Sequence, residues 1–426
     1  MVAEAEVTTA AQTSRAEQTE LTRERIVTAA RRLFTTHGYR AVSLRDIAAE
    51  AGVTHPGLLR HFSGKDELLD LVLRAFDDRN DVESWEELVA DADGALPFSA
   101  AAARNARIPG YLPLFAGLVG EASIADHPAH AAMRGHAERF APAAREVLDT
   151  AMSDGSMASD RDVDGETLRL MAAWDALQVM QLYQPDRVDT AALIAEHERL
   201  LAYPPGWRDP SAPVSGHAPM PAMTPIGPEP EAETGYRSGR ARRARILSDA
   251  MTLFSQEGYA DTSLRDIAAE VGVSKSALYH HFPSKDALLL AVLEERDRRI
   301  DEAISALTVD GAADFLRALP EAADDNARTQ PGLIEVYAVI SCEAIPADHP
   351  AHAYFTERFA HALDSFETMF RAAASTGELP AHRDPAHEAA WLLALWDGLQ
   401  YQWLYDRDGV DVAAQLRAHL ADVLPV

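Results

Sequence analysis

Apolar residues near position 43 recur at the spacing of a helix. Leu44, Ile47 and Ala48 form one apolar face, with polar residues between them. Ser43 stands where a side-chain oxygen caps a first turn, and Asp46 follows three residues later, where a carboxylate faces free N–H groups. The pattern therefore predicts a short amphipathic helix that starts at Ser43.

A second short helix is predicted directly after the first. Gly52 supplies the permissive backbone that a tight turn between helices needs. Thr54 is a favourable cap, and Leu58 and Phe62 are spaced to point inward. Two short helices joined by a three-residue turn make a helix-turn-helix, whose second helix can enter the major groove of DNA.

The stretch Ser43–Leu73 recurs as Ser263–Leu293, with 19 of 31 positions identical. A period of 220 residues indicates a duplicated domain, because solenoid repeats are far shorter. Later echoes are 222 apart, as in Trp174-Asp175 and Trp396-Asp397. The duplication therefore extends beyond the helix-turn-helix.

From about residue 81 to 202 the pattern favours helices throughout, and no strand is predicted. Nine of the chain's 24 prolines fall in 203–234, so we expect this segment to be an extended linker that packs no core. The predicted helices of this first half are 98–107, 111–124, 128–154, 164–183 and 189–201.

Composition places the chain among globular proteins. It has 426 residues, of which 47% are hydrophobic and 25% charged, and no apolar run is long enough to span a membrane. The polar, acidic N-terminus lacks signal-peptide features and is expected to be a disordered tail. Its single cysteine, Cys342, excludes an intramolecular disulfide and favours a cytoplasmic location.

The net charge of −28 is unusual for a protein that binds DNA. The acidity lies outside the repeated stretches, because 20–76 holds nine Arg/Lys against seven Asp/Glu and 236–293 holds eight against six. Phosphate binding depends on the local surface, and an acidic remainder limits non-specific association. The charge distribution is therefore compatible with DNA binding.

The repeated pattern resembles the tetracycline-repressor (TetR) family of transcriptional regulators. Besides the helix-turn-helix, the resemblance includes Leu33-Phe34 to Gly38-Tyr39, its second copy Leu253-Phe254 to Gly258-Tyr259, and the His-Phe-x-x-Lys-Asp-x-Leu-Leu ending. It implies an all-α fold in which each unit has an N-terminal DNA-binding domain, here called a reader, and a C-terminal helical ligand and dimerisation domain. The expected division is a tail (1–19), first reader (20–78), first helical domain (79–202), Pro-rich linker (203–235), second reader (236–295) and second helical domain (296–426).

The resemblance and the helix-turn-helix pattern together indicate which residues face DNA. They lie at the starts of the four short helices and on the outer face of each second helix. The expected DNA-contacting residues are Ser43, Arg45, Thr54, His55, Gly57, Leu59, Arg60, His61 and Lys65, with Ser263, Arg265, Ser274, Lys275, Ser276, Tyr279, His280, His281 and Lys285.

Two basic features add to this interpretation. The chain's three lysines, Lys65, Lys275 and Lys285, all lie in the repeated stretches, and two occupy equivalent positions. This placement indicates phosphate contact, with a compositional accident as the alternative. Five arginines in 237–245 open the second unit, either as an arm to phosphate or the minor groove, or as a solvated helix start.

Aromatic and methionine residues in the helical domains are candidates for an apolar ligand pocket, which the resemblance implies. Such residues at helical spacing also serve as ordinary core, and that alternative stays open for each of them. The candidate pocket residues are Tyr111, Phe115, Met133, Trp174, Tyr337, Phe355 and Trp396.

The sequence DHPAH occurs in both halves, at 126–130 and 348–352. Two histidines three residues apart can hold a metal, but Pro in a first turn is typical of a helix start. No third ligand type recurs nearby, so no metal or cofactor is predicted. No nucleophile-base pair, paired carboxylate or phosphate loop recurs either, so the chain is not expected to be an enzyme.

These observations predict a ligand-responsive transcriptional regulator of the repressor type, with operator DNA and a small effector as partners. The last two helices of each half are apolar on more than one side and are expected to pair within the chain. Unlike second helices would then read an asymmetric operator. One alternative is a homodimer that uses mainly the second reader; a remote one is a metal-binding or enzymatic helical module.

Overall fold

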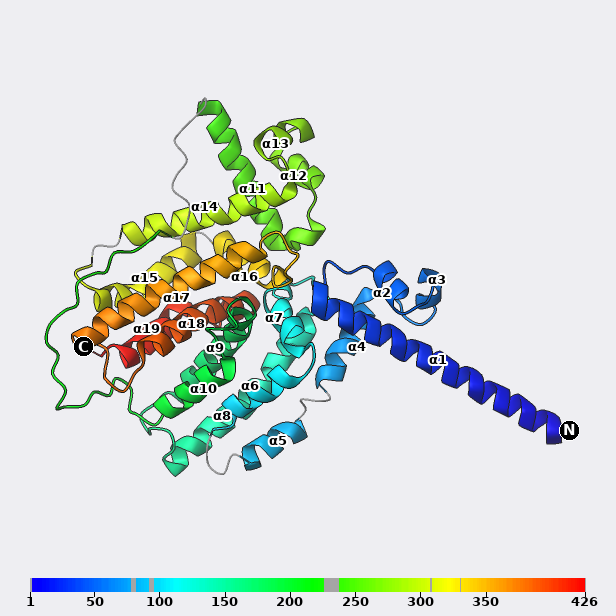
Figure 1. Ribbon diagram of the computed structural model, residues 1–426, viewed down its shortest axis with the longest axis horizontal. Coiled ribbons are helices and arrows are strands. Elements are labelled where there is room, and N and C mark those ends of the chain that lie inside the picture. The colour runs from blue at the N-terminus through cyan, green and yellow to red at the C-terminus, as the bar shows by residue number, and fades with distance from the viewer. Residues whose placement is uncertain are drawn as a thin grey trace.

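The computed structural model describes residues 2–77, 82–91, 96–225, 237–306, 309–329 and 331–425 (Figure 1). Over these residues the predicted all-α architecture is confirmed, and the only pairing of β type is one isolated bridge between Pro219 and Gly311. None of the described helices combines the length and the apolar character that a membrane crossing needs. The first unit consists of α1 (Val2–His37), α2 (Leu44–Glu50), α3 (His55–Leu58), α4 (Lys65–Asp77), α5 (Val82–Asp91), α6 (Phe98–Arg107), α7 (Tyr111–Glu121), α8 (His130–Asp154), α9 (Val163–Tyr183) and α10 (Thr190–Leu200).

The second unit repeats this order of helices, with one long α14 where the first unit has α4 followed by α5. The expected boundary between second reader and second helical domain, at 295/296, therefore falls inside a continuous helix, while its counterpart at 78/79 lies outside the described residues. The helices are α11 (Arg237–Asp261), α12 (Leu264–Val271), α13 (Lys275–His281), α14 (Lys285–Ser305), α15 (Ala312–Thr329), α16 (Pro331–Glu343), α17 (His352–Ser375), α18 (Pro385–Tyr405) and α19 (Val412–Val423).

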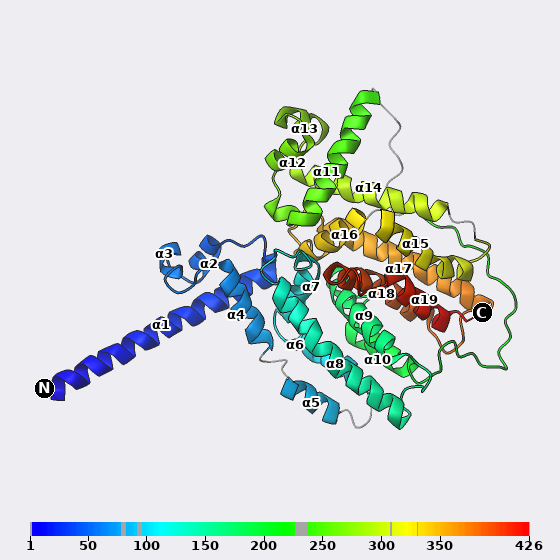
Figure 2. The ribbon, with the colours of Figure 1, turned by 180° about the vertical axis from the view of Figure 1, so that it is seen from behind.

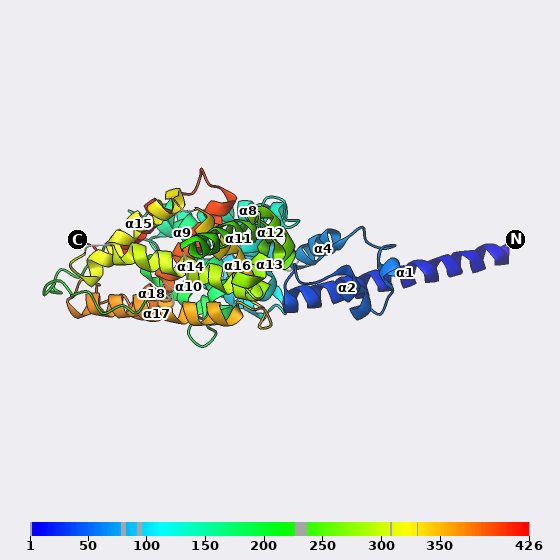
Figure 3. The ribbon, with the colours of Figure 1, turned by 90° about the horizontal axis from the view of Figure 1, so that it is seen from above.

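The N-terminal segment differs from the expectation of a disordered tail. Helix α1 begins at Val2 and continues without interruption to His37, so residues 2–19 are helical. Figures 1 and 3 show this helix projecting away from the rest of the molecule. Ala, Glu, Gln and Arg together make up 11 of the 18 residues in 2–19, and these residue types have high intrinsic helix propensity. Their propensity allows the helix to extend beyond the packed part of the reader.

Side-chain caps define both helix-turn-helix motifs. The Ser43 hydroxyl accepts from the Asp46 N–H, and the Asp46 carboxylate accepts from the Ser43 N–H at 2.9 Å, which completes a capping box. Ser263 and Asp266 repeat the first of these contacts at the start of α12. Gly272, which ends α12, has a φ of 71°, a left-handed conformation that favours glycine. These caps and the turn therefore set where the second helix of each motif, here called the recognition helix, begins.

The two helical domains pack against each other within the chain. Helices α9 and α18, which are equivalent in the two units, run along one another (Figures 1 and 2). Gly398 permits their closest approach, because a Cβ there would lie 1.8 Å from the Ala172 carbonyl oxygen. Two equivalent hydroxyls cross the interface, Tyr183 to the Ser341 carbonyl at 2.7 Å and Tyr405 to the Val119 carbonyl at 3.1 Å.

A buried ion-pair network lies at one end of this interface. Arg161 contacts Glu166 at 2.7 Å, and Arg383, 222 residues later, contacts Glu388 at 2.8 Å. Asp422 joins the two pairs, at 3.1 Å from Arg161 and 3.0 Å from Arg383. Because all of these side chains are largely buried, removal of any one leaves an uncompensated charge. The network therefore fixes the register of the two units.

The linker differs from the expectation that it packs no core. Its described part, 203–225, runs along the second helical domain, and Ala218 is fully buried there. The Ala218 N–H donates to the Glu378 carboxylate at 2.9 Å, and its carbonyl accepts from the Ala312 N–H at 3.0 Å. Arg208 donates to the Glu378 carbonyl at 2.8 Å. Extended proline-rich chain still offers backbone donors and acceptors, and these bind the neighbouring loops; 226–236 lies outside the described residues.

Candidate nucleic-acid interface and cavity

Helices α3 and α13 carry the residues expected to read DNA. Thr54 caps α3 by accepting from the Gly57 N–H, and Ser274 caps α13 by accepting from the Ala277 N–H. Leu58 and Leu278 are fully buried and anchor the two helices. The two readers project from different sides of the helical body: the second reader, with α13, lies at the top of the view, and the first reader, with α3, lies at the side opposite the C-terminus (Figures 1 and 2).

Five large apolar side chains are recorded as exposed in the described part of the chain, and two of them occupy equivalent positions in the readers. Leu59 is 46% exposed and Tyr279 43% exposed. Single exposed apolar side chains are common on protein surfaces, so it is the equivalent placement of these two on the outer face of the recognition helices that matches a contact face. Their unlike chemistry means that the two readers present different surfaces. Arg60 and His280 are exposed beside them, and His55, Gly57, His61 and His281 are partly buried.

The second reader has the longer and more basic recognition helix. Helix α13 has seven residues, whereas α3 has four and contains Pro56 and Gly57. Lys275 and Ser276 are exposed, and the Lys275 ammonium lies 5.6 Å from the Tyr279 ring centroid. Burial first, then the nearby charges of His280, Arg242 and Arg243, lowers the pKa of His281. The described arginines of α11 therefore lie close enough to α13 to contribute to one positive surface.

The remaining expected DNA residues divide into exposed cations and capping groups. Arg45 and Arg265 are exposed at the starts of α2 and α12. The hydroxyls of Ser43 and Ser263 accept hydrogen bonds as caps, so their first role is to hold the helix starts.

Lys65 and Lys285 have partners inside their own readers. The Lys65 ammonium donates to the carbonyls of Tyr39 at 3.1 Å and Val42 at 3.0 Å, and lies 4.2 Å from the Tyr39 ring centroid. Lys285 repeats the arrangement, at 3.3 Å from the Ala260 carbonyl. In both units this lysine therefore holds the loop that precedes the helix-turn-helix. Phosphate contact by these lysines remains a prediction.

A cavity of about 940 Å³ lies in the first helical domain. Of the expected pocket residues, Tyr111, Met133 and Trp174 line it, while Phe115 stacks on Tyr111 with ring centroids 4.2 Å apart. Helix α18 of the second unit contributes Gln402 and Tyr405 to the wall, together with Asp406 and Val410 just beyond it. The cavity is open to solvent on one side, and its wall is formed by both units and not by the first alone.

Asp175 is the principal charged group on the inner wall of this cavity. It accepts a hydrogen bond from the Gln402 side chain at 2.8 Å. Burial raises the pKa of the Asp175 carboxyl to about 6, and the His136 charge and the Gln402 hydrogen bond oppose that rise. Gln178 also lines the cavity, and its Oε1 is buried with no hydrogen-bond partner. In the sequence, Asp175 stands out only as part of the repeated pair Trp174-Asp175, and Gln178 is not singled out. The signal that could have identified Asp175 is an acidic residue on an otherwise apolar helix face.

The corresponding region of the second unit is filled. Tyr337 and Phe355 are fully buried in the core, and Trp396 packs partly buried against it. The guanidinium carbons of Arg296 and Arg358 lie 3.9 Å and 4.7 Å from the Tyr337 ring centroid. Tyr337 and Phe355 are therefore brought together in the core, with ring centroids 5.6 Å apart and charged side chains over Tyr337, while Trp396 lies at the edge of that core.

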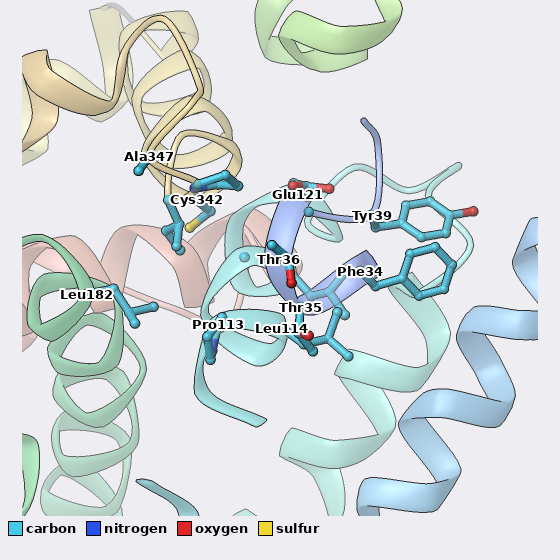
Figure 4. Close-up of a pocket in the computed structure, with 15 residues that line it drawn as sticks. Phe34, Thr35, Thr36, Tyr39, Pro113, Leu114, Glu121, Leu182, Cys342 and Ala347 are labelled. Atoms are coloured by element: carbon cyan, nitrogen blue, oxygen red, sulfur yellow. The ribbon is translucent and has the colours of Figure 1, made fainter. Parts of the chain in front are cut away.

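A second, smaller cavity of about 230 Å³ lies where the first reader meets both helical domains (Figure 4). Phe34 and Tyr39 line it from the reader, Glu121 from α7, and Cys342 from α16. The first reader is therefore in direct contact with helices of both units, so a movement of this reader displaces the residues that they contribute to the cavity wall.

The DHPAH histidines support the loops before α8 and α17. His130 and His352 hydrogen-bond the carbonyls of Ala122 and Ala344 at 2.8 Å and 3.0 Å. Burial lowers the pKa of His127 to about 3, so this ring is neutral. Within the part of the chain that the structure describes, no three His, Cys, Asp or Glu side chains form a group that could hold a metal.

Comparison with protein families gives two matches. The family model described as bacterial regulatory proteins, tetR family, matches twice, at 26–72 and 246–292. A model described as BetI-type transcriptional repressor, C-terminal, matches 344–425.

Curated proteins give similar results. The chain is 31% identical over 134 residues to the HTH-type transcriptional repressor KstR2 of Rhodococcus jostii, covering 32% of this chain and 57% of the relative. It is 36% identical over 100 residues to the HTH-type transcriptional repressor KstR of Mycobacterium tuberculosis, covering 24% and 46%. The chain thus spans about half the length of each relative.

Solved structures also match over one unit. A TetR-family transcriptional regulator from Agrobacterium tumefaciens aligns with 44% of this chain and 99% of its own, at 22% identity and a TM-score of 0.38. The structure entitled "Salmonella enterica GusR" aligns with 44% and 96%, at 28% identity and a TM-score of 0.36.

Proposed function

Because this chain belongs to the TetR family of bacterial regulatory proteins, with two TetR-like units in tandem, we propose that it is a DNA-binding transcriptional regulator of the repressor type. The similarity to proteins named as repressors supports DNA binding and regulation rather than catalysis. The two readers then act as the two halves of one binding unit, with α3 in one half-site and α13 in the other.

One observation carries the proposal of a pseudo-dimer. The equivalent helices α9 and α18 pack on each other inside the chain, and the shared ion pairs of Asp422 link the two units. This is the kind of pairing that two separate TetR-like subunits need another molecule to provide. Since the two recognition helices differ at almost every outward position, the operator is expected to be asymmetric.

Release by a small molecule completes the proposed mechanism. The cavity of the first helical domain is walled by α9 and by the end of α18, so a bound molecule touches both units. It can change the spacing of the readers only to the extent that it binds one arrangement more tightly than the other. The effector is therefore proposed to act across the interface between the units.

Selection of DNA from a random pool tests the proposal, with the mass of the complex measured by light scattering. The expected result is an asymmetric sequence bound by one 46.4 kDa chain. A palindrome bound by two chains would instead support a homodimer that uses mainly the second reader. The longer, more basic α13 favours that second candidate over one that uses the first reader.

A further inference from the structure

Two carboxylates occupy equivalent places at the interface between the units. Asp175 on α9 and Asp397 on α18 are 222 residues apart, and each follows a tryptophan. Asp397 is buried and Asp175 is half-buried on the cavity wall, and burial raises the pKa of each. Their surroundings differ, however, and the difference shows what each needs.

In the second unit, the chain supplies its own cations. Arg358 contacts Asp297 at 3.1 Å and stacks over Tyr337, whose hydroxyl donates to Asp397 at 3.1 Å. Arg296 lies over the same ring, and both arginine charges act on the Asp397 carboxyl. Two carboxylates, Asp297 and Asp397, two guanidinium groups and an aromatic ring thus form a compact cluster, in which both arginines pair directly with Asp297.

In the first unit, the residues at the two arginine positions are Phe76 and His136, by offsets of 220 and 222. In the described part of the chain, no guanidinium group acts on the Asp175 carboxyl; the charge of His136 acts on it, and the neutral amide of Gln402 donates a hydrogen bond to it. The space that Arg358 occupies in the second unit corresponds here to the side of the cavity lined by His136. The carboxylate is present, and its guanidinium partner is missing.

A second observation points to a ligand with hydrogen-bond donors. Gln178 is 8% exposed, lines the cavity one helical turn after Asp175, and leaves its Oε1 unpaired. The equivalent Gln400 of the second unit also leaves its Oε1 unpaired, so what distinguishes Gln178 is its place on the cavity wall. There a donor from a ligand can recover the free energy that a buried acceptor without a partner costs. Trp174, Tyr111 and Phe140 supply aromatic walls, which favour an organic cation with an apolar body.

Four arginines line the cavity, and two of them, Arg74 and Arg134, lie at its mouth. Of the other two, Arg104 is partly buried and Arg139 is exposed. Arg74 is paired with Asp70 at 2.8 Å and Arg134 with Glu138 at 3.0 Å, and all four side chains are at least half exposed. Their charges are therefore compensated at the mouth, where water screens them. Among the described residues, none of the four arginines is a group whose charge acts on the Asp175 carboxyl.

We infer that the first unit binds one organic cation per chain, an amine, guanidine or quaternary ammonium on an apolar body, with its charge at Asp175, and that the second unit binds none. Its role as an effector rests on the proposed function, but its binding does not. In the second unit, Arg358 is a permanent internal substitute for that ligand. The chain thus has two readers and a single sensor.

Matched probes test the inference on the full-length protein by calorimetry and thermal shift. Three head groups, primary amine, alcohol and carboxylate, are compared on biphenylmethyl and naphthylmethyl bodies. The amine is expected to bind on the order of tenfold more tightly than the alcohol of the same body, at one equivalent per chain. Asp175→Asn should abolish the preference for the amine, whereas Asp164→Asn, the same change at the exposed start of α9, should preserve it.

Equal or tighter binding of the alcohols or carboxylates would overturn the inference, and so would two equivalents per chain or an unaltered preference in Asp175→Asn. Absence of binding by both amines would also count against it. Thermal melting shows that each variant is folded. Operator binding is measured in parallel: a chain that binds DNA but shows no amine preference contradicts only this inference, whereas a chain that binds no DNA contradicts the proposed function.

Discussion

The ionisation of Asp175 is costly at neutral pH. Its pKa in the folded protein is about 6, against 3.8 in an unfolded chain, so folding favours the protonated form. The resulting loss of folding stability is absent below about pH 4, grows between about pH 4 and pH 6, and is constant above that. A difference of about two units corresponds to an upper bound of about 3 kcal/mol.

Asp175→Asn is therefore expected to stabilise the protein at pH 7.5, by about 1–3 kcal/mol, because it removes the buried charge and keeps an oxygen for Gln402. Near pH 4 the same substitution should change stability little. Chemical denaturation at the two pH values measures the difference. Equal effects at both would show that the Asp175 charge is well solvated in the cavity.

Lysine substitutions separate a residue that holds the reader together from one that faces DNA. Lys65→Ala removes the donor to two loop carbonyls, so the free energy of unfolding of the reader should fall by about 1–2 kcal/mol. Lys275→Ala, at an exposed position of α13, is the matched variant. It should leave stability unchanged and reduce the salt dependence of operator binding by about one ion. Thermal melting measures the stability of each variant, and operator binding at several salt concentrations measures the salt dependence. If Lys65→Ala has normal stability and a reduced salt dependence, then Lys65 contacts phosphate and does not hold the loop.

At the scale of elements, the two recognition helices differ most clearly at one equivalent pair. Tyr279 presents a hydroxyl that can donate to a phosphate, and Leu59 cannot. Tyr279→Leu is expected to weaken operator binding about fivefold, which corresponds to one ordinary hydrogen bond of about 1 kcal/mol. Leu59→Tyr should strengthen binding by a similar factor, as measured by fluorescence anisotropy on a selected operator. If neither substitution changes affinity, neither position contacts DNA.

The sequence predicted the short helices well because their signals are local. Ser43, Thr54, Ser263 and Ser274 all cap helices where their side chains indicated, and the buried anchors follow the predicted spacing. The packing of the linker was not predictable, because Ala218 is held by Glu378, which lies 160 residues away. Long-range contacts of this kind leave no periodic pattern in the chain.

The difference between the two helical domains was also beyond sequence reasoning. Tyr337 and its counterpart Phe115 both look like pocket or core positions when the copies are aligned. Their environments differ because Arg296 replaces Phe76 and Arg358 replaces His136, at positions that only the fold brings beside them. A charged residue in an apolar helix predicts burial or function, but the partner decides which.

At the scale of the whole molecule, the two readers are joined to the helical domains in different ways. The first reader has its own hydrophobic core, formed by α1, α2, α3 and α4 with residues of α7. The core of the second reader is continuous with that of both helical domains, and α11 packs closely on α16. The first reader is therefore the part better able to move as a unit relative to the rest.

One side chain connects the two readers directly. Arg40, in the loop after α1, donates to the carbonyl of Glu257 in α11, and its Nε lies 3.7 Å from the Glu121 carboxylate of α7. Its side chain is 7% exposed, so the contact is shielded from water. The equivalent residue of the second unit is Ala260, so the contact exists once per molecule.

Arg40→Ala gives the first reader the residue found in the second, and it should loosen the spacing of α3 and α13. Affinity for the selected operator is then expected to fall several-fold, because more arrangements of the readers compete with the one that fits. Affinity for operators lengthened or shortened by one or two base pairs should fall less, so the dependence on half-site spacing flattens. Anisotropy titrations over such a spacing series measure both effects. Arg32→Ala, which breaks an exposed ion pair within the first reader, is the control and should leave the spacing profile unchanged. A uniform loss of affinity across the series in Arg40→Ala would mean that Arg40 supports the fold of the first reader without setting its distance from the second.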